Sequence, residues 1–320
     1  MTTPEPPDRL SVDALAPGLL AHLGGRAPPA PSWFEAAMRR APEVLSVEAE
    51  AAAIEVLVWG EHGRPGLLLL HGNGAHAGWW RPLAPFFADR YRVAAMSWSG
   101  MGGSDWRPRY SAAQFAREAM AVISAAGLDA HAEKPLVAAH SFGGFIALHM
   151  AQAFGDRLKG VATLDARIAP PSADHDGPPR RSRPNRVYAT FEEALARFRL
   201  APPQPCENLY YVDSIGRESL RQAPLPDGEG KGWTWKFDPF VMSHFDFLDL
   251  THLYRDLRCP IAQAWGDRSQ LVTPTVARYM TDGAPPGSPA IVIPDADHHV
   301  MLDQPLATVA ALNGLFSAWP

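Results

Sequence analysis

The chain has 320 residues, of which 47% are hydrophobic and 20% charged, and its net charge is −5. This length and composition suit one large globular domain, or a core domain with an insertion. Because no cluster of Lys and Arg stands out, we expect no nucleic-acid partner. No apolar stretch is long enough to cross a bilayer, so we expect no membrane association and take the cytoplasm as the default location. The sequence gives no indication of the oligomeric state.

The first 32 residues are rich in Pro, Ala and Gly, and they predict an N-terminal extension that lies over the surface or is partly disordered. From Val44 onward, short apolar runs alternate with stretches of helical periodicity. The runs are LSVEAE, AAIEVLVWG, GLLLLHG, RVAAMSW, PLVAAHS, GVATLDA, PIAQAWGD and AIVIPDA. Continuous apolar runs separated by helices predict an α/β fold, in which a mostly parallel twisted sheet carries helices on both faces. The first two runs have no helix between them and predict an antiparallel hairpin at the sheet edge.

A block rich in Pro and Trp, from about Pro170 to Arg258, interrupts this alternation. Its helical pieces, FEEALARFRL and HFDFLDLTHLYRDL, predict an inserted helical lid above the carboxyl ends of the strands, where sites of such sheets lie. The expected organisation is therefore an extension (1–32), a core (33–169), the lid (170–258) and the rest of the core (259–320). Aromatic residues of the lid and of one core loop could line an apolar pocket, although each taken singly is better explained as packing. They are Trp79, Trp80, Trp233, Trp235, Phe237, Phe240, Phe245 and Phe247.

The segment VAAHSFGGFIALHM carries the candidate nucleophile. A buried run ends at Ser141, and a helix begins directly with Phe142. A serine on such a turn is held in a strained conformation with its hydroxyl exposed. The turn requires small residues two positions before and after the serine, and here they are Ala139 and Gly143.

These motifs resemble the α/β-hydrolase family over most of the chain from about Val44. The loop HGNGAHAGWW is similar to the oxyanion loop of that family, and the resemblance implies that the backbone N–H groups of Asn73 and Phe142 form the oxyanion hole. The stretch RVAAMSWSGMGGSDW resembles the family's D-x-x-G-x-G-x-S segment, but it has Ser97 where Asp is usual. We expect this departure to matter little, because that position is mostly structural.

The resemblance also implies the base. The catalytic His of the family stands five residues before an acidic residue and seven before a Pro, and counting back from Asp303 and Pro305 gives His298. His299 is then expected to point elsewhere. Because adjacent histidines diverge and no third ligand has a suitable spacing, we expect no metal site, and the chemistry requires no cofactor.

The acid departs from the commonest pattern of the family. The usual position, at the end of G-x-x-D after PIAQAWGD, is Ser269. Asp165 ends the preceding strand, where some relatives place the acid, and Asp267 lies two residues before the empty position. We favour Asp165, and Asp267 remains the alternative.

A serine nucleophile with a His base and an oxyanion hole suits acyl transfer. We therefore expect a serine hydrolase that cleaves a small hydrophobic carboxylic ester or lactone. Ser141 argues against epoxide hydrolases and haloalkane dehalogenases, which use Asp at this position. Two alternatives are a C–C bond hydrolase of the meta-cleavage type and a non-catalytic relative that binds a small ligand.

Overall fold

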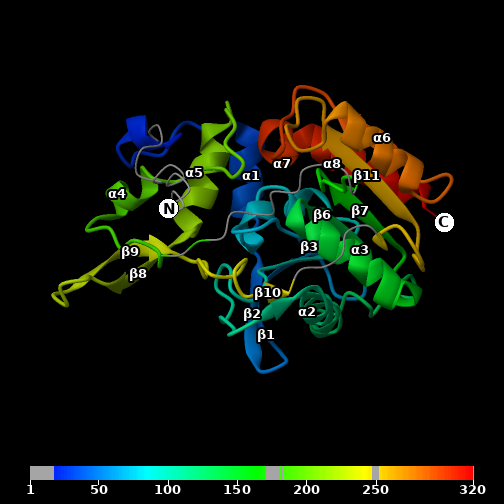
Figure 1. Ribbon diagram of the computed structural model, residues 1–320, viewed down its shortest axis with the longest axis horizontal. Helices are drawn as coiled ribbons and strands as arrows, with labels where there is room; N and C mark the ends of the chain where they lie inside the picture. The colour runs from blue at the N-terminus through cyan, green and yellow to red at the C-terminus, as the bar shows by residue number, and fades with distance from the viewer. Residues whose placement is uncertain (1–17, 171–180, 182, 247–251, 320) are drawn as a thin grey trace, which may run out of the picture.

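The computed structural model describes residues 18–170, 181, 183–246 and 252–319. Its main sheet has eight strands in the order β1-β2-β4-β3-β6-β7-β11-β12 (Figure 1). The strands are β1 (Glu43–Ala49), β2 (Ala52–Trp59), β3 (Gly66–Leu70), β4 (Arg92–Met96), β6 (Leu136–His140), β7 (Gly160–Leu164), β11 (Ile261–Gly266) and β12 (Ala290–Ile293). Each overlaps one of the eight apolar runs, so the predicted fold class is confirmed. β2 is antiparallel to both of its neighbours, and the other neighbouring pairs are parallel.

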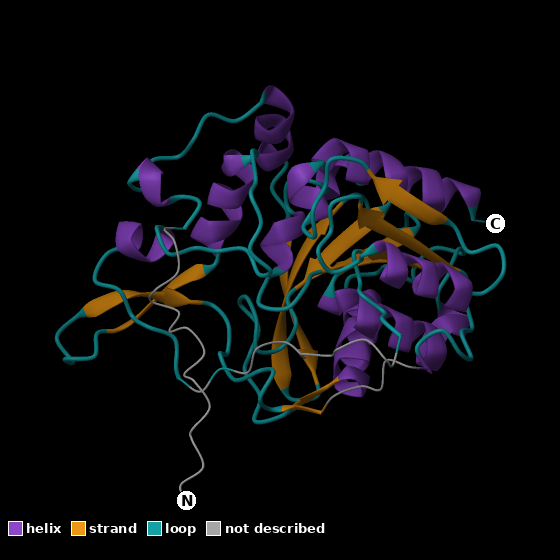
Figure 2. Cartoon of the chain, turned by 45° about the horizontal axis from the view of Figure 1, so that its top comes forward, coloured by secondary structure: helices purple, strands orange, loops and turns teal. Residues whose placement is uncertain are grey.

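Helices cover both faces of the sheet (Figure 2). The side chains of β3 explain why: Leu68 and Leu70 belong to the hydrophobic cluster on one face, and Leu67 and Leu69 to the cluster on the other. A strand buried on both faces needs a continuous apolar run. The helices outside the insertion are α1 (Ser32–Arg39), α2 (Ala112–Ala125), α3 (Phe142–Phe154), α6 (Pro274–Gly283), α7 (Val300–Asp303) and α8 (Pro305–Ala318). Short 3₁₀ turns are η2 (Ala21–Leu23), η3 (Ala77–Trp80), η4 (Ala84–Phe86) and η5 (Gly155–Arg157). None of the helices in the described ranges is both long and apolar enough to span a membrane.

The segment between β7 and β11 carries small elements that stand apart from the main sheet (Figure 1). They are α4 (Phe191–Leu195), α5 (Leu209–Glu218), β8 (Leu220–Pro224) and β9 (Lys231–Trp235). A further strand of this segment, β10 (Phe245–Asp246), lies against the core. β8 and β9 form an antiparallel hairpin, and β10 pairs with β5 (Tyr110–Ser111) of the core.

The prediction of a helix over 244–257 was wrong at both described ends: residues 245–246 are a strand, and residues 253–257 are turns, bends or irregular. Phe245 and Asp246 are extended because their backbone pairs with Tyr110 and Ser111, and the side chain of Phe245 is buried against the core. Residues 247–251 of that expected helix lie outside the described residues.

The described part of the N-terminal extension packs on the inserted segment. Leu20 is 1% exposed and belongs to the same hydrophobic cluster as Leu195 and Phe198. A guanidinium nitrogen of Arg217 donates to the carbonyl of Gly25 at 2.6 Å. The two segments, whose hydrogen bond spans 192 positions, therefore share one apolar core. Residues 1–17 of the predicted extension lie outside the described residues.

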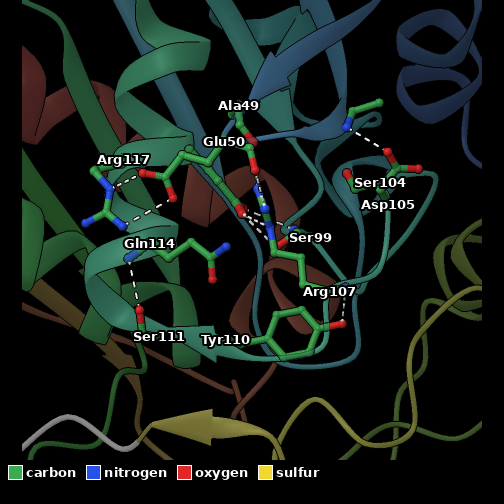
Figure 3. A network of polar contacts seen from close by, with 12 residues as sticks. Ala49, Glu50, Ser99, Ser104, Asp105, Arg107, Tyr110, Ser111, Gln114 and Arg117 are labelled. Atoms are coloured by element: carbon green, nitrogen blue, oxygen red, sulfur yellow. Dashed lines mark hydrogen bonds and ion pairs between the residues drawn. The ribbon is translucent and has the colours of Figure 1, made fainter.

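A buried ion pair fixes the loop that follows β4 (Figure 3). Arg107 is bonded through Nε to Glu118 on α2 at 3.0 Å, and its terminal nitrogens donate to the carbonyls of Ala49 and Glu50. Ser99 donates to the same carboxylate at 2.7 Å. The Glu118 side chain is fully buried, so its charge depends on these partners. The network joins the β1–β2 turn, the loop after β4 and α2.

Candidate active site

Ser141 stands between β6 and α3 in a backbone conformation that L-residues rarely adopt, with φ 52° and ψ −121°. Its backbone N–H donates to the carbonyl of Leu164 on β7 at 2.8 Å, and its carbonyl accepts from Gly144 N at 2.8 Å. Strain of this kind persists only where the surrounding structure enforces it. The strand-to-helix turn predicted from the sequence is present.

Close backbone contacts explain the small residues around this turn. A Cβ at Gly143 would lie 2.6 Å from the carbonyl oxygen of His71, and a Cβ at Gly144 would lie 2.5 Å from Cβ of Ala166. Ala139 is 0% exposed. The A-x-S-x-G pattern is therefore a packing requirement of the turn.

The loop after β3 passes directly beside Ser141. A Cβ built on Gly72 would lie 3.1 Å from Cβ of Ser141. Within the described ranges, neither the backbone N–H of Asn73 nor that of Phe142 has a protein acceptor. Two unpaired backbone donors next to the candidate nucleophile suit an oxyanion.

Side-chain hydrogen bonds hold this loop in place. His76 accepts from Gly78 N at 3.1 Å through Nδ1, and its Nε2 lies 3.0 Å from the hydroxyl of Ser219 in the inserted segment. Ser97 accepts from Ala77 N at 2.9 Å and donates to Glu55 at 2.6 Å. Glu55, on β2, thus places a carboxylate beside Ser97, the residue that stands where the family motif has Asp.

Asp165 directly follows β7 and is 0% exposed. Its Oδ1 accepts from Nδ1 of His298 at 2.7 Å and from the hydroxyl of Ser269 at 2.8 Å. Its Oδ2 accepts from the backbone N–H of Gly266 at 3.1 Å. Like Ser141, Asp165 is a non-glycine residue at positive φ (48°). The carboxylate is thus oriented by three donors, one of which is the imidazole.

The alternative acid lies elsewhere. Asp267 is exposed, and its Oδ1 accepts from the backbone N–H of Ala296 at 3.2 Å. Of the two candidate acids, the structure brings Asp165 into contact with His298. The role of Ser269 was not expected from the sequence, because its contact with Asp165 spans 104 positions.

Hydrogen bonds to Asp303 and to Gln204 of the inserted segment hold the loop that carries His298 in place. Asp303 accepts from Asp297 N and from the side chain of Gln204, both at 2.8 Å, and Gln204 accepts from His299 N at 2.9 Å. These contacts explain why an acidic residue follows the His by five positions: it closes the loop.

His140, the residue before Ser141, links the nucleophile turn to the loop that carries His298. Its Nε2 lies 3.0 Å from the carbonyl oxygen of His298. No hydrogen bond among the described residues joins the Ser141 hydroxyl to His298. In enzymes without bound substrate this contact is often long and shortens on binding.

The expectation that the side chain of His299 points away from His298 was wrong. Its ring centroid lies 4.8 Å from that of His298 and 5.4 Å from that of His140. His299 precedes α7 with φ −88° and ψ 64°, so its backbone is not extended and the usual divergence of neighbouring side chains does not apply. Burial, with a smaller effect of His298, holds the pKa of both His140 and His299 well below the ordinary range. Both rings are therefore neutral near pH 7.

Aromatic rings lie on two sides of the site. Phe245 of the inserted segment packs edge-on against Phe142, with ring centroids 5.4 Å apart, and Trp79 lies 5.4 Å from His299. Trp233 and Trp235 pack instead on Phe191 and Phe198, within the insertion. Phe247 lies outside the described residues.

Comparison with known proteins agrees with this architecture. The model of the alpha/beta hydrolase family matches residues 67–312, and the chain belongs to that family. A solved structure of E-2-(acetamidomethylene)succinate hydrolase superposes with a TM-score of 0.69 at 20% identity, covering 87% of this chain and 100% of that chain, which shows the shared fold.

Two curated relatives are esterases or lipases by name. The chain is 26% identical over 251 residues to the pimeloyl-(acyl-carrier protein) methyl ester esterase of Chromobacterium violaceum, a match that covers 78% of this chain and 92% of the relative. It is 32% identical over 117 residues to lipase LipV of Mycobacterium tuberculosis, covering 36% of this chain and 42% of the lipase. The chain thus spans less than half the length of LipV, and 36% of the length of a further relative.

Proposed function

We propose that the protein is a serine hydrolase that cleaves a carboxylic ester or a lactone through an acyl-enzyme intermediate. Ser141 is the nucleophile, His298 the base and Asp165 the orienting acid, and the N–H groups of Asn73 and Phe142 form the oxyanion hole. The observation that carries the proposal is the buried 2.7 Å contact between Asp165 Oδ1 and His298 Nδ1. A carboxylate in this position requires the proton on Nδ1 and leaves Nε2 as the proton acceptor.

The reaction follows from these roles. Oγ of Ser141 bonds to the carbonyl carbon while His298 Nε2 takes its proton, and the carbonyl electron pair moves to the oxygen held by the two backbone amides. The tetrahedral intermediate collapses, and His298 gives the proton to the departing alkoxide. Water then attacks the acyl-serine with His298 again as base, which releases the acid and restores Ser141. In a lactone the alkoxide stays attached to the acyl group.

The surroundings support a hydrophobic acyl or ring substrate. Phe142 and Phe245 are 8% and 7% exposed and form an apolar wall one residue from the nucleophile. The methyl ester esterase and lipase among the relatives agree with an ester. We further propose that residues 170–258 act as a lid over the site, since Phe245 and Gln204 of this segment contact Phe142 and the backbone of His299.

A substrate panel tests the proposal. Nitrophenyl esters of increasing acyl length, lactones of several ring sizes and a vinylogous diketo acid would be compared with the purified chain, with Ser141→Ala and with Ser124→Ala, which removes an exposed hydroxyl on α2. We expect turnover of esters or lactones by the wild-type chain and by Ser124→Ala, and none above background by Ser141→Ala. Rapid cleavage of the diketo acid alone would overturn the ester assignment in favour of C–C bond hydrolysis. Equal turnover by Ser141→Ala would overturn the mechanism.

A further inference from the structure

Three buried imidazoles gather next to the nucleophile turn. His140, His298 and His299 are 1%, 2% and 4% exposed, and their ring centroids form a triangle with sides of 4.8, 4.8 and 5.4 Å. One ring nitrogen from each lies within 4.8 Å of the other two. The sequence offered no third ligand for the His298–His299 pair, because His140 is 158 positions away from His298.

The hydrogen bonds decide which nitrogen of each ring has a free lone pair. His298 Nδ1 faces the carboxylate of Asp165 and carries the proton, so Nε2 is unprotonated. His140 Nε2 faces a carbonyl oxygen and carries the proton, so Nδ1 is unprotonated, and it is buried without a partner. Neither nitrogen of the neutral His299 ring has a hydrogen bond within the described ranges; the Pro202 backbone lies near it but outside hydrogen-bonding geometry.

Three imidazoles that each offer a lone pair are the donor set of borderline divalent cations such as Zn²⁺. With a metal–nitrogen distance of about 2.0–2.1 Å, three imidazoles on one tetrahedral ion place their ring centroids about 5 Å apart, which is close to the triangle observed. Inward rotation of the rings would therefore bring the nitrogens together without moving the backbone far. Asp165 behind His298 supplies the carboxylate–histidine pairing that orients imidazole ligands in many metal sites.

We propose that His140, His298 and His299 form a binding site for a zinc-like divalent cation that inhibits the hydrolase reversibly. The cation would occupy the Nε2 lone pair of His298, the same lone pair that accepts the proton of Ser141. Binding and proton transfer then exclude one another. With three imidazole ligands, a tetrahedral ion keeps a fourth position for water. The inhibitory part rests on the proposed function, whereas the binding part stands on the histidines alone.

Binding is tested without reference to activity. The full chain, freed of metal with a chelator, would be titrated with Zn²⁺ by calorimetry and with Co²⁺ by visible absorption. We expect one saturable site per chain and the intense bands of tetrahedral Co²⁺. His299→Gln should weaken binding about tenfold or more, whereas His299→Cys should retain it, because a thiolate also ligates Zn²⁺. His149→Gln, a change in a half-buried histidine of α3 outside the cluster, is the matched control. Circular dichroism and the Tm show that each variant is folded.

The outcomes separate the two parts of the proposal. If Zn²⁺ binding does not saturate, or if folded His299→Gln binds Zn²⁺ as tightly as the wild-type chain, the proposed binding site is overturned. Binding as expected, together with loss of ester hydrolysis over the same Zn²⁺ range and recovery with chelator, supports the whole proposal. Zn²⁺ binding with an unchanged rate of hydrolysis would overturn the inhibitory part. A chain that binds Zn²⁺ but turns over no substrate at any metal level would count against the proposed function, while the calorimetry and the Co²⁺ spectrum would still support the site.

Discussion

The hydroxyl of Ser269 donates a 2.8 Å hydrogen bond to Oδ1 of Asp165, the same oxygen that accepts from His298. Ser269 occupies the position where the commonest version of the family has its acid. The residue at the empty position thus contacts the carboxylate that we propose has replaced it. On this proposal the acid stands one strand away from its usual place, at the end of β7 instead of the end of β11, and these two strands are neighbours in the sheet.

Because Ser269 contacts Asp165, we predict that an aspartate at position 269 can replace the carboxylate of Asp165. Asp165→Asn should lower kcat by about 10⁴, as loss of the acid does in a related triad. Adding Ser269→Asp should recover about tenfold or more, because a carboxylate at 269 would stand within reach of His298 Nδ1. The measurement is the kcat of both variants on the best ester of the panel. No recovery in a folded double variant would show that position 269 does not reach the imidazole.

Gly143→Ala should destabilise the chain by about 1–3 kcal/mol, because the added methyl group would lie 2.6 Å from the backbone oxygen of His71, which cannot give way easily. The matched control is Gly314→Ala on α8, where a Cβ meets nothing within 4 Å. That change should stabilise the chain by about 0.4–1 kcal/mol, because alanine has less conformational freedom in the unfolded state. Urea unfolding measures both. Equal effects at the two positions would contradict the packing explanation of the motif.

Stability should fall as the pH is lowered below about 6.5. Burial lowers the pKa of His71 to about 3 and that of His76 to about 4. Below the unfolded value of 6.5, the unfolded chain therefore binds protons that the folded chain does not, which favours unfolding.

The free energy of unfolding should change with pH by up to about 1.4 kcal/mol per pH unit for each of His71 and His76. This slope applies between the pKa of the group in the folded chain and its value of 6.5 in the unfolded chain. Urea unfolding between pH 7 and 5 measures the slope. His76→Gln should reduce it, since glutamine does not titrate, and an unchanged slope in this variant would contradict the assignment of His76.

The sequence predicted much of this fold because the relevant patterns are local. A continuous apolar run such as GLLLL is enough to mark a strand buried on both faces. The choice of His298 over His299 as the candidate base came from the resemblance to the family, whose spacing was counted back from Asp303. The sequence favoured Asp165 over Asp267 but left both open, because the contact of Asp165 with His298 spans 133 positions and no local pattern contains it. The orientation of His299 was predicted wrongly because the divergence of adjacent side chains holds for extended backbone, and His299 lies at a bend. The strand at Phe245 was mistaken for helix because its partner, Tyr110, is remote in sequence.

The most direct test of the central claim, that Asp165 and His298 activate Ser141, is the rate at which a fluorophosphonate labels the chain, followed by intact mass. One adduct per chain is expected in the wild-type protein and none in Ser141→Ala. Asp165→Asn should slow labelling by a factor on the order of 10³–10⁴, whereas Asp267→Asn should leave the rate within about twofold of wild type. Labelling of Asp165→Asn at the wild-type rate, or the same loss in Asp267→Asn, would contradict the account.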